Sequence, residues 1–237
     1  MTDGKTGKRR LLILLGTVLL AAAAFLVVVS MIELEREQID CDTEILDLSI
    51  EDFSMNFAVL DRYIRAQFPE KCSGLYFVDA QADITFENGS VKSGTMKLCY
   101  FRYIDESKEG GNIEAVEFFI DPVAGTVQNS VHYQGSGRSY QTSGETISGN
   151  ISAIPLEDYM QNLTSLTGVQ SSEAVRMLAD CGSSFMDVSF FIEEGQEAVY
   201  SERVTGWDED AGFASRITEP LNERRGAFAD DGGRWNL

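Results

Sequence analysis

The order of hydrophobic and polar residues sets an uninterrupted apolar segment apart from a long alternating region that follows it. Residues 11–32 read LLILLGTVLLAAAAFLVVVSMI and hold no charged side chain. At about 1.5 Å of rise per residue, a helix of this length spans roughly 33 Å, close to the ~30 Å core of a bilayer. The pattern therefore predicts a transmembrane helix at 11–32.

The charges on the two sides of this segment predict its orientation. Residues 1–10 hold four basic side chains and one acidic side chain, whereas acids outnumber bases after residue 32. The positive-inside rule places the basic arm in the cytoplasm and residues 33–237 outside it. The prediction is a single-pass cell-membrane protein in which residues 11–32 contact membrane lipid. A cleaved signal peptide is the alternative, although its apolar core is usually shorter, at roughly 7–15 residues.

Two later stretches have helical patterns. Residues 49–68 place apolar side chains at i, i+4 and i+7, which is the spacing of an amphipathic helix. Pro69 then ends this helix. Residues 155–180 form a second helical region, which Gly168 divides in two. The polar residues 33–49 ahead of the first helix are interpreted as a stalk.

Alternating β-forming residues between the helical regions predict antiparallel strands. Asn88-Gly89 is a strong hairpin signal between two such runs, and residues 185–206 read as strand, turn and strand. The predicted class is α+β, with an N-terminal transmembrane helix followed by a helix-plus-antiparallel-sheet ectodomain. The predicted segments are a basic arm 1–10, the transmembrane helix 11–32, the stalk 33–49, a helix with a sheet 50–135, a Gly/Ser-rich connection 136–154, a second helix-hairpin unit 155–206 and a tail 207–237.

One stretch combines residue types that an active site could use. Residues 116–135, VEFFIDPVAGTVQNSVHYQG, contain an aspartate, a proline, a glycine and the single histidine of the chain. A hairpin explains the same residues, because Asp121 starts a turn, Pro122 fixes φ at about −65° and Gly125 takes a positive φ. The Asp121 carboxylate then bonds to nearby backbone, and His132 is a structural or surface residue. We predict the hairpin.

Charge and motif spacing narrow the function classes further. The net charge of −19 disfavours nucleic acid as a partner, because the phosphates would be repelled. Residues 208–219 place acids at positions 1, 3 and 12 of a calcium-binding loop, but Phe213 stands where that loop needs glycine and Arg216 adds a positive charge. The sequence therefore predicts no catalytic, cofactor-binding or metal-binding residue, and no cofactor.

The cysteines leave two alternatives open. None of the four belongs to a C-x-x-C pair, so zinc-ribbon and thioredoxin-type sites have no support. An even number permits two disulfides in three connectivities, whereas a reducing environment would leave four small apolar side chains. The residues concerned are Cys41, Cys72, Cys99 and Cys181.

Short matches between the two halves suggest an internal repeat. IEDF at 50–53 and LEDY at 156–159 each open a predicted helix, and the turn sequences ENG and EEG follow later. The offset between the matched glutamates is 106 residues in both cases, Glu51 to Glu157 and Glu87 to Glu193. A duplicated helix-then-hairpin unit and coincidence both explain matches of this length.

The order of a helix and antiparallel strands, ending in VEFFIDPVAGTV at 116–127, resembles PepSY-like domains of bacterial envelope proteins. The likeness covers residues 50–135 and, more loosely, 155–205. It implies a helix packed on a small antiparallel sheet. It also implies a non-enzymatic role in binding or regulating other envelope proteins.

Two functions from different classes follow from these patterns. The first is a membrane-anchored, extracytoplasmic binding or accessory protein of the bacterial cell envelope, without catalysis and with an envelope protein as partner. The alternative is a carboxylate-dependent extracellular hydrolase, supported by the 38 acidic residues. A pocket with two converging, partly buried carboxylates favours the hydrolase, and a shallow sheet face with an open edge favours the binding protein.

Overall fold

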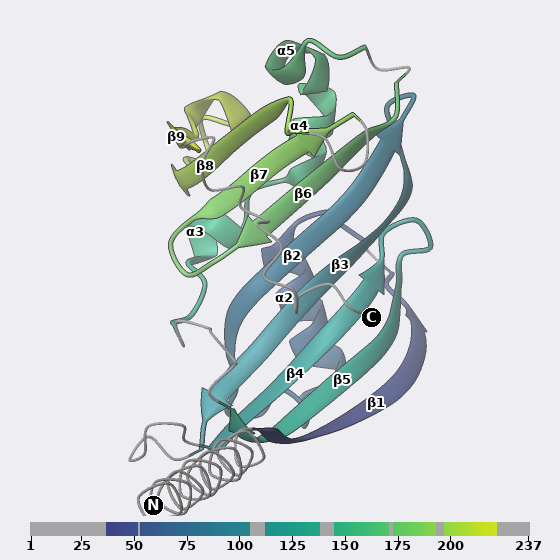
Figure 1. Cartoon of the computed structure of the whole chain (residues 1–237), viewed down its shortest axis with the longest axis vertical. Helices are drawn as coiled ribbons and strands as arrows, with labels where there is room; N and C mark the ends of the chain where they lie inside the picture. Colours follow the sequence, from purple (N-terminus) through teal and green to yellow (C-terminus); the bar gives the residue numbers. More distant parts are fainter. Residues whose placement is uncertain are drawn as a thin grey trace, which may run out of the picture.

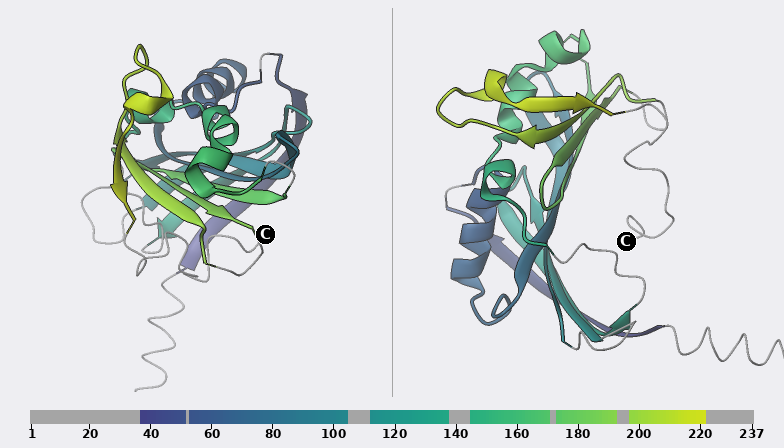
Figure 2. Two further views of the ribbon diagram at one scale, coloured as in Figure 1. Left: turned by 90° about the horizontal axis from the view of Figure 1, so that it is seen from above. Right: turned by 90° about the vertical axis from the view of Figure 1, so that its left-hand side faces the viewer.

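The computed structural model of the chain describes residues 37–51, 53–104, 112–137, 145–170, 173–192 and 197–221. They form one nine-stranded antiparallel sheet, and the described helices pack on one of its faces (Figure 1 and Figure 2). The strands are β1 Glu37–Ser49, β2 Tyr76–Glu87, β3 Ser90–Tyr103, β4 Asn112–Asp121, β5 Thr126–Gly137, β6 Val175–Cys181, β7 Met186–Phe191, β8 Tyr200–Gly206 and β9 Ile217–Pro220. The helices are α2 Phe57–Gln67, α3 Gly149–Ser152, α4 Leu156–Gln161, α5 Leu163–Thr167 and the 3₁₀-helix η1 Phe213–Ser215.

The sheet consists of two meanders joined at its centre. The strand order is β1-β5-β4-β3-β2-β6-β7-β8-β9. The strands β2 to β5 follow α2, and the strands β6 to β9 follow α4 and α5, so the two halves share one topology. The first strands of the halves, β2 and β6, pair antiparallel. The offset of 106 residues would make 193–196 the equivalent of the β2–β3 turn, between β6 and β7. Those residues instead connect β7 to β8, so the offset does not describe the shared topology. The four residues themselves lie outside the described part of the chain.

The first helix begins later than its pattern predicts. Its N-cap is Asn56, whose side-chain oxygen accepts hydrogen bonds from the backbone N–H of Ala58 at 3.0 Å and of Val59 at 3.2 Å. From Phe57 onward the helix buries one face against the sheet, which confirms the amphipathic pattern there. The predicted start at Ser49 and the predicted stalk at 33–49 are wrong for the described residues, because β1 runs through to Ser49.

The second helical region is also shorter than predicted. Gly168 ends α5 with a left-handed φ of 75°, as a C-terminal glycine should. The predicted helical turn around 175–180 is wrong, because Val175–Cys181 is β6. Val175, Met177 and Ala179 are buried at every second position, and pairing with β2 overrides the helix propensity of this short run.

The predicted α+β class is therefore wrong. Strands dominate the described chain, and the strand β1 precedes the first described helix. The prediction of a single-pass cell-membrane protein is contradicted as well, because none of the helices within the described ranges is long and apolar enough to cross a membrane. The predicted span 11–32, its lipid contact and the basic arm 1–10 lie outside those ranges. Residues 217–220, predicted as part of a tail, form β9.

The structure confirms the hairpins predicted at Asn88-Gly89 and at Asp121–Gly125. Asn88 and Gly89 have φ of 53° and 72°, the positive values that a tight turn between β2 and β3 requires. In the β4–β5 turn, one Asp121 side-chain oxygen accepts hydrogen bonds from the backbone N–H of Val123 at 2.8 Å and of Ala124 at 3.0 Å. Gly125 has a φ of 62° and donates its N–H to the Asp121 carbonyl at 2.9 Å. Asp121 is thus a turn residue.

This geometry predicts opposite effects for two substitutions in the β4–β5 turn. Asp121→Asn keeps a side-chain oxygen acceptor and should change the free energy of unfolding little. Gly125→Val places a β-branched residue at a φ of 62° and should cost roughly 1–3 kcal/mol. Denaturant unfolding of the two variants measures the difference. A Gly125→Val protein as stable as the native one would contradict this description of the turn.

Candidate functional site

His132 lies on the helix-covered face, where a carboxylate and an arginine hold it. Its Nε2 is 3.3 Å from Glu114 Oε1, and Arg102 Nε donates to Glu114 Oε2 at 2.8 Å. Within the described ranges, His132 makes no hydrogen bond to the side chain of a serine, threonine or cysteine. The arrangement orients the histidine, and the described chain gives it no hydroxyl or thiol hydrogen-bond partner to activate as a nucleophile.

Several carboxylates of the sheet are held by arginines. Arg176 donates two hydrogen bonds, of 2.8 and 2.7 Å, to the Asp83 carboxylate. Glu202 is buried, and it accepts hydrogen bonds from Arg216 Nε at 2.8 Å and from the Tyr159 hydroxyl at 2.6 Å. Burial, and then the negative charge of Glu202, raise the pKa of Tyr159, so its hydroxyl stays protonated and donates. These bidentate and buried pairs join neighbouring elements.

Two carboxylates do meet across β6 and β7. Asp180 and Asp187 are register partners on the face opposite the helices. Asp187 is held by Arg203 through two hydrogen bonds of 2.7 Å, and its side chain is 7% exposed. The hydrogen bond to Asp187 raises the pKa of the Arg203 guanidinium. Asp187 thus serves an ion pair between β7 and β8.

A polar pocket of about 490 Å³ opens beside the Asp83–Arg176 pair. The hydroxyls of Thr85, Ser93 and Thr95 also line it. Asp83 is the one carboxylate among the described lining residues, and it is already paired. Hydrolysis by carboxylates uses two such groups flanking the scissile bond. The pocket therefore does not supply the constellation on which the hydrolase hypothesis depends.

The acidic segment 208–219 folds back on itself. Trp207 Nε1 donates to the Gly212 carbonyl at 3.2 Å, and the Asp210 N–H donates to Asp208 Oδ1 at 3.1 Å. Arg216 turns toward Glu202. Across the described residues, no group of three or more histidine, cysteine or acidic side chains could hold a metal ion.

The four cysteines are free thiols in the structure. Cys41 is exposed on β1, and the other three are buried. Burial raises the pKa of the Cys72 thiol to about 11 and also raises the pKa of the Cys181 thiol. Cys41 is consequently the accessible thiol of this set.

The edge of the sheet formed by β1 is its most unusual feature. This strand is 13 residues long and lies at one end of the strand order, so the described chain pairs it on one side alone (Figure 1). Its register with β5 is continuous from Glu37 to Ile45 and shifts between Ile45 and Leu48, where Asp47 has a φ of 46°. The opposite edge, β9, has four residues and ends in Pro220.

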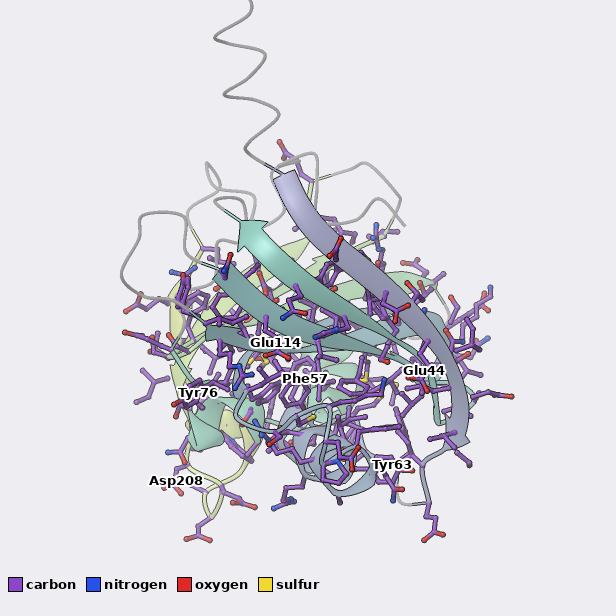
Figure 3. All side chains as sticks on the ribbon, turned by 90° about the horizontal axis from the view of Figure 1, so that it is seen from below. Glu44, Phe57, Tyr63, Tyr76, Glu114 and Asp208 are labelled. Carbon is purple, nitrogen blue, oxygen red and sulfur yellow. The ribbon has the colours of Figure 1, made fainter. Side chains whose placement is uncertain are left out.

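Side chains of β1 divide by chemistry between the two faces of the sheet. Asp42 opposes His132, which opposes the core residue Val116, so Asp42 belongs to the helix-covered face. Asp40 and Glu44 share that face because strand side chains alternate. The other face of β1, opposite the helices, carries Cys41, Thr43 and Ile45. All six of these side chains are exposed, Ile45 at 76%, and Figure 3 shows Glu44 on the outer strand.

Sequence reasoning missed this edge. The run IDCDTEI, residues 39–45, alternates β-forming side chains with acids, which is a strand signal. Its charge led to the interpretation as a stalk.

Comparison of the chain with protein-family models, curated proteins and solved structures finds no significant match.

Thiol labelling tests the exposure of β1. A maleimide should modify Cys41 in the native protein, and the buried thiols should react after denaturation, because burial limits both access and thiolate formation. Cys41→Ser is the control. Native Cys41→Ser protein that reacts as fast as the unsubstituted chain would contradict the placement of Cys41.

The pKa of Cys72 predicts a loss of stability at alkaline pH. Burial raises this pKa from 9.0 to about 11, so the folded state favours the protonated thiol. The contribution is fully present below about pH 9 and declines as the pH rises to about 11. Denaturant unfolding across this window should show a smaller decline for Cys72→Ala. Equal declines in both proteins would contradict the role of this thiol.

Proposed function

We propose that the protein is a non-catalytic binding module that receives an extended segment of a partner protein along the outer edge of β1. The observation that carries the proposal is the continuous register from Glu37 to Ile45 with its outer side unpaired in the described chain. Strand addition to such an edge is a recurring mode of peptide recognition. The likeness of 116–127 to PepSY-like domains supports a binding or regulatory role of the same kind.

Backbone chemistry explains how the edge would bind. Every second residue of an edge strand directs its N–H and C=O away from the sheet, and these groups are strong hydrogen-bonding partners. A partner strand would satisfy them with main-chain groups of its own, at a net gain of about 0.5–1.5 kcal/mol for each bond. The partner would contribute affinity through its backbone and specificity through its side chains.

Common protections of an edge are weak at β1. Proteins shield edges by keeping them short, by adding proline, by a bulge or by charge. The edge β9 has the first two protections, since it has four residues and contains Pro220. The strand β1 has no proline, and its irregularity lies beyond Ile45. Its remaining protection is negative charge, which repels some partners and attracts others.

Two neighbouring proline substitutions test the edge. The amides of Thr43 and Glu44 point to opposite sides of β1, so one bonds β5 and the other points outward. Proline at the inward position should lower stability by roughly 1–3 kcal/mol. Proline at the outward position should leave stability nearly unchanged and abolish partner binding. Because Glu44→Pro also removes a carboxylate, Glu44→Ala is the control for that loss. A proline at the outward position that leaves partner binding intact would contradict the proposal.

Site-specific photo-crosslinking in the source cells provides the partner for that test. A photoreactive amino acid replaces Thr43 on β1, and the control replaces Thr218, which is exposed on β9. We expect one protein to crosslink at position 43, through a segment that binds the purified chain when synthesised. Equal crosslinking at both positions, or a crosslinked segment that does not bind, would contradict the proposal.

A further inference from the structure

We infer that the segment received by β1 is basic, with positive side chains at every second position and uncharged β-forming residues between them. This inference rests on the proposed function of the edge. The strand β1, EQIDCDTEILDLS, has five carboxylates and no basic residue. An incoming strand lies alongside these carboxylates, so its own charges decide whether it is attracted or repelled.

Because side chains alternate between the faces of a strand, selection of the partner by charge acts on one face of the sheet. Asp40, Asp42 and Glu44 are exposed on the helix-covered side, roughly 7 Å apart along the strand. Lysine or arginine at positions i, i+2 and i+4 of a partner strand would stand beside them. On the other face the partner would meet Cys41, Thr43 and Ile45, where threonine, valine or isoleucine packs well.

The three carboxylates differ in how far they are already neutralised. Glu44 forms an ion pair with Lys71. Asp40 and Asp42 form no ion pair with another described residue. The side chains of Arg102 and His132 both contact Glu114. Asp40 and Asp42 therefore contribute most of the selection, and Glu44 less.

The same charges disfavour a second copy of this chain as the occupant. Pairing β1 with β1 would bring the acidic face of one strand against the acidic face of the other, and like charges directly opposite destabilise a sheet. A basic partner is attracted by the charge that repels self-association. The register shift after Ile45 limits the paired stretch to residues 37–45.

Two peptides of identical composition test the alternation. Each has nine residues, matching 37–45. One places lysine at every even position, where antiparallel pairing sets it opposite Asp40, Asp42 or Glu44, with valine and threonine between, and the other groups all lysines at one end. Fluorescence anisotropy with the full chain should show the alternating peptide binding at least about tenfold more tightly, with affinity falling as salt rises.

Matched variants locate the charges that matter. Asp40→Asn with Asp42→Asn should weaken binding of the alternating peptide about three- to tenfold, as expected for exposed ion pairs. Asp208→Asn with Asp210→Asn removes the same charge far from β1 and should change binding less than about twofold. Equal binding of the two peptides, or equal weakening by the two double variants, would overturn the inference.

An uncharged alternating peptide of threonine and valine distinguishes failure of the basic pattern from failure of strand addition at β1. If it competes with the position-43 crosslink as well as the lysine peptide does, the edge binds strands without charge selection and the basic pattern is wrong. If neither peptide competes with the crosslink, strand addition at β1 is wrong as well. Competition by the lysine peptide alone supports both.

Discussion

The antiparallel pairing of β2 with β6 is the contact on which the rest of the architecture depends. Seven residue pairs, from Ala80–Cys181 to Phe86–Val175, join strands that are distant in sequence. Small side chains at Ala80, Ala82 and Ala179 are almost fully buried there. Because this pairing joins two meanders at their first strands, it makes one continuous sheet and leaves β1 and β9 as its two edges.

An open sheet has two edge strands whose outer backbone groups need protection from unwanted pairing, and this sheet protects its two edges to different degrees. The β9 edge is short and contains Pro220, whereas β1 presents a long edge that carries Asp40, Asp42 and Glu44 on one face. The residues that look catalytic contribute to the scaffold: Asp121 closes a turn, and Glu202 is buried in an ion pair. In the proposed function, recognition uses backbone that the described chain leaves unpaired, and selectivity comes from the side chains that flank it.

The sequence predicts those parts of the fold that local interactions determine. Asn88-Gly89 and Asp121–Gly125 encode their turns within a few residues, so both hairpins were predictable. The strand β6 was not, because its burial comes from β2, whose paired residues lie 89 to 101 positions earlier in the chain. The alternation in 39–45 was visible, but its position at an edge depends on the order of all nine strands. The first helix begins late, after Asn56, and the second helical region ends early, at Gly168, so more of the chain is strand than the 3.6-residue pattern implied.

Residue-resolved hydrogen exchange on the full chain, with and without its crosslink-identified partner segment, tests the central claim most directly. In the free protein, every second amide between 37 and 45 should exchange quickly, because its N–H points away from β5. Binding should slow those same amides at least about tenfold and leave β9 unchanged. Protection that appears on another surface, with the outward amides of β1 unaffected, would contradict recognition by strand addition.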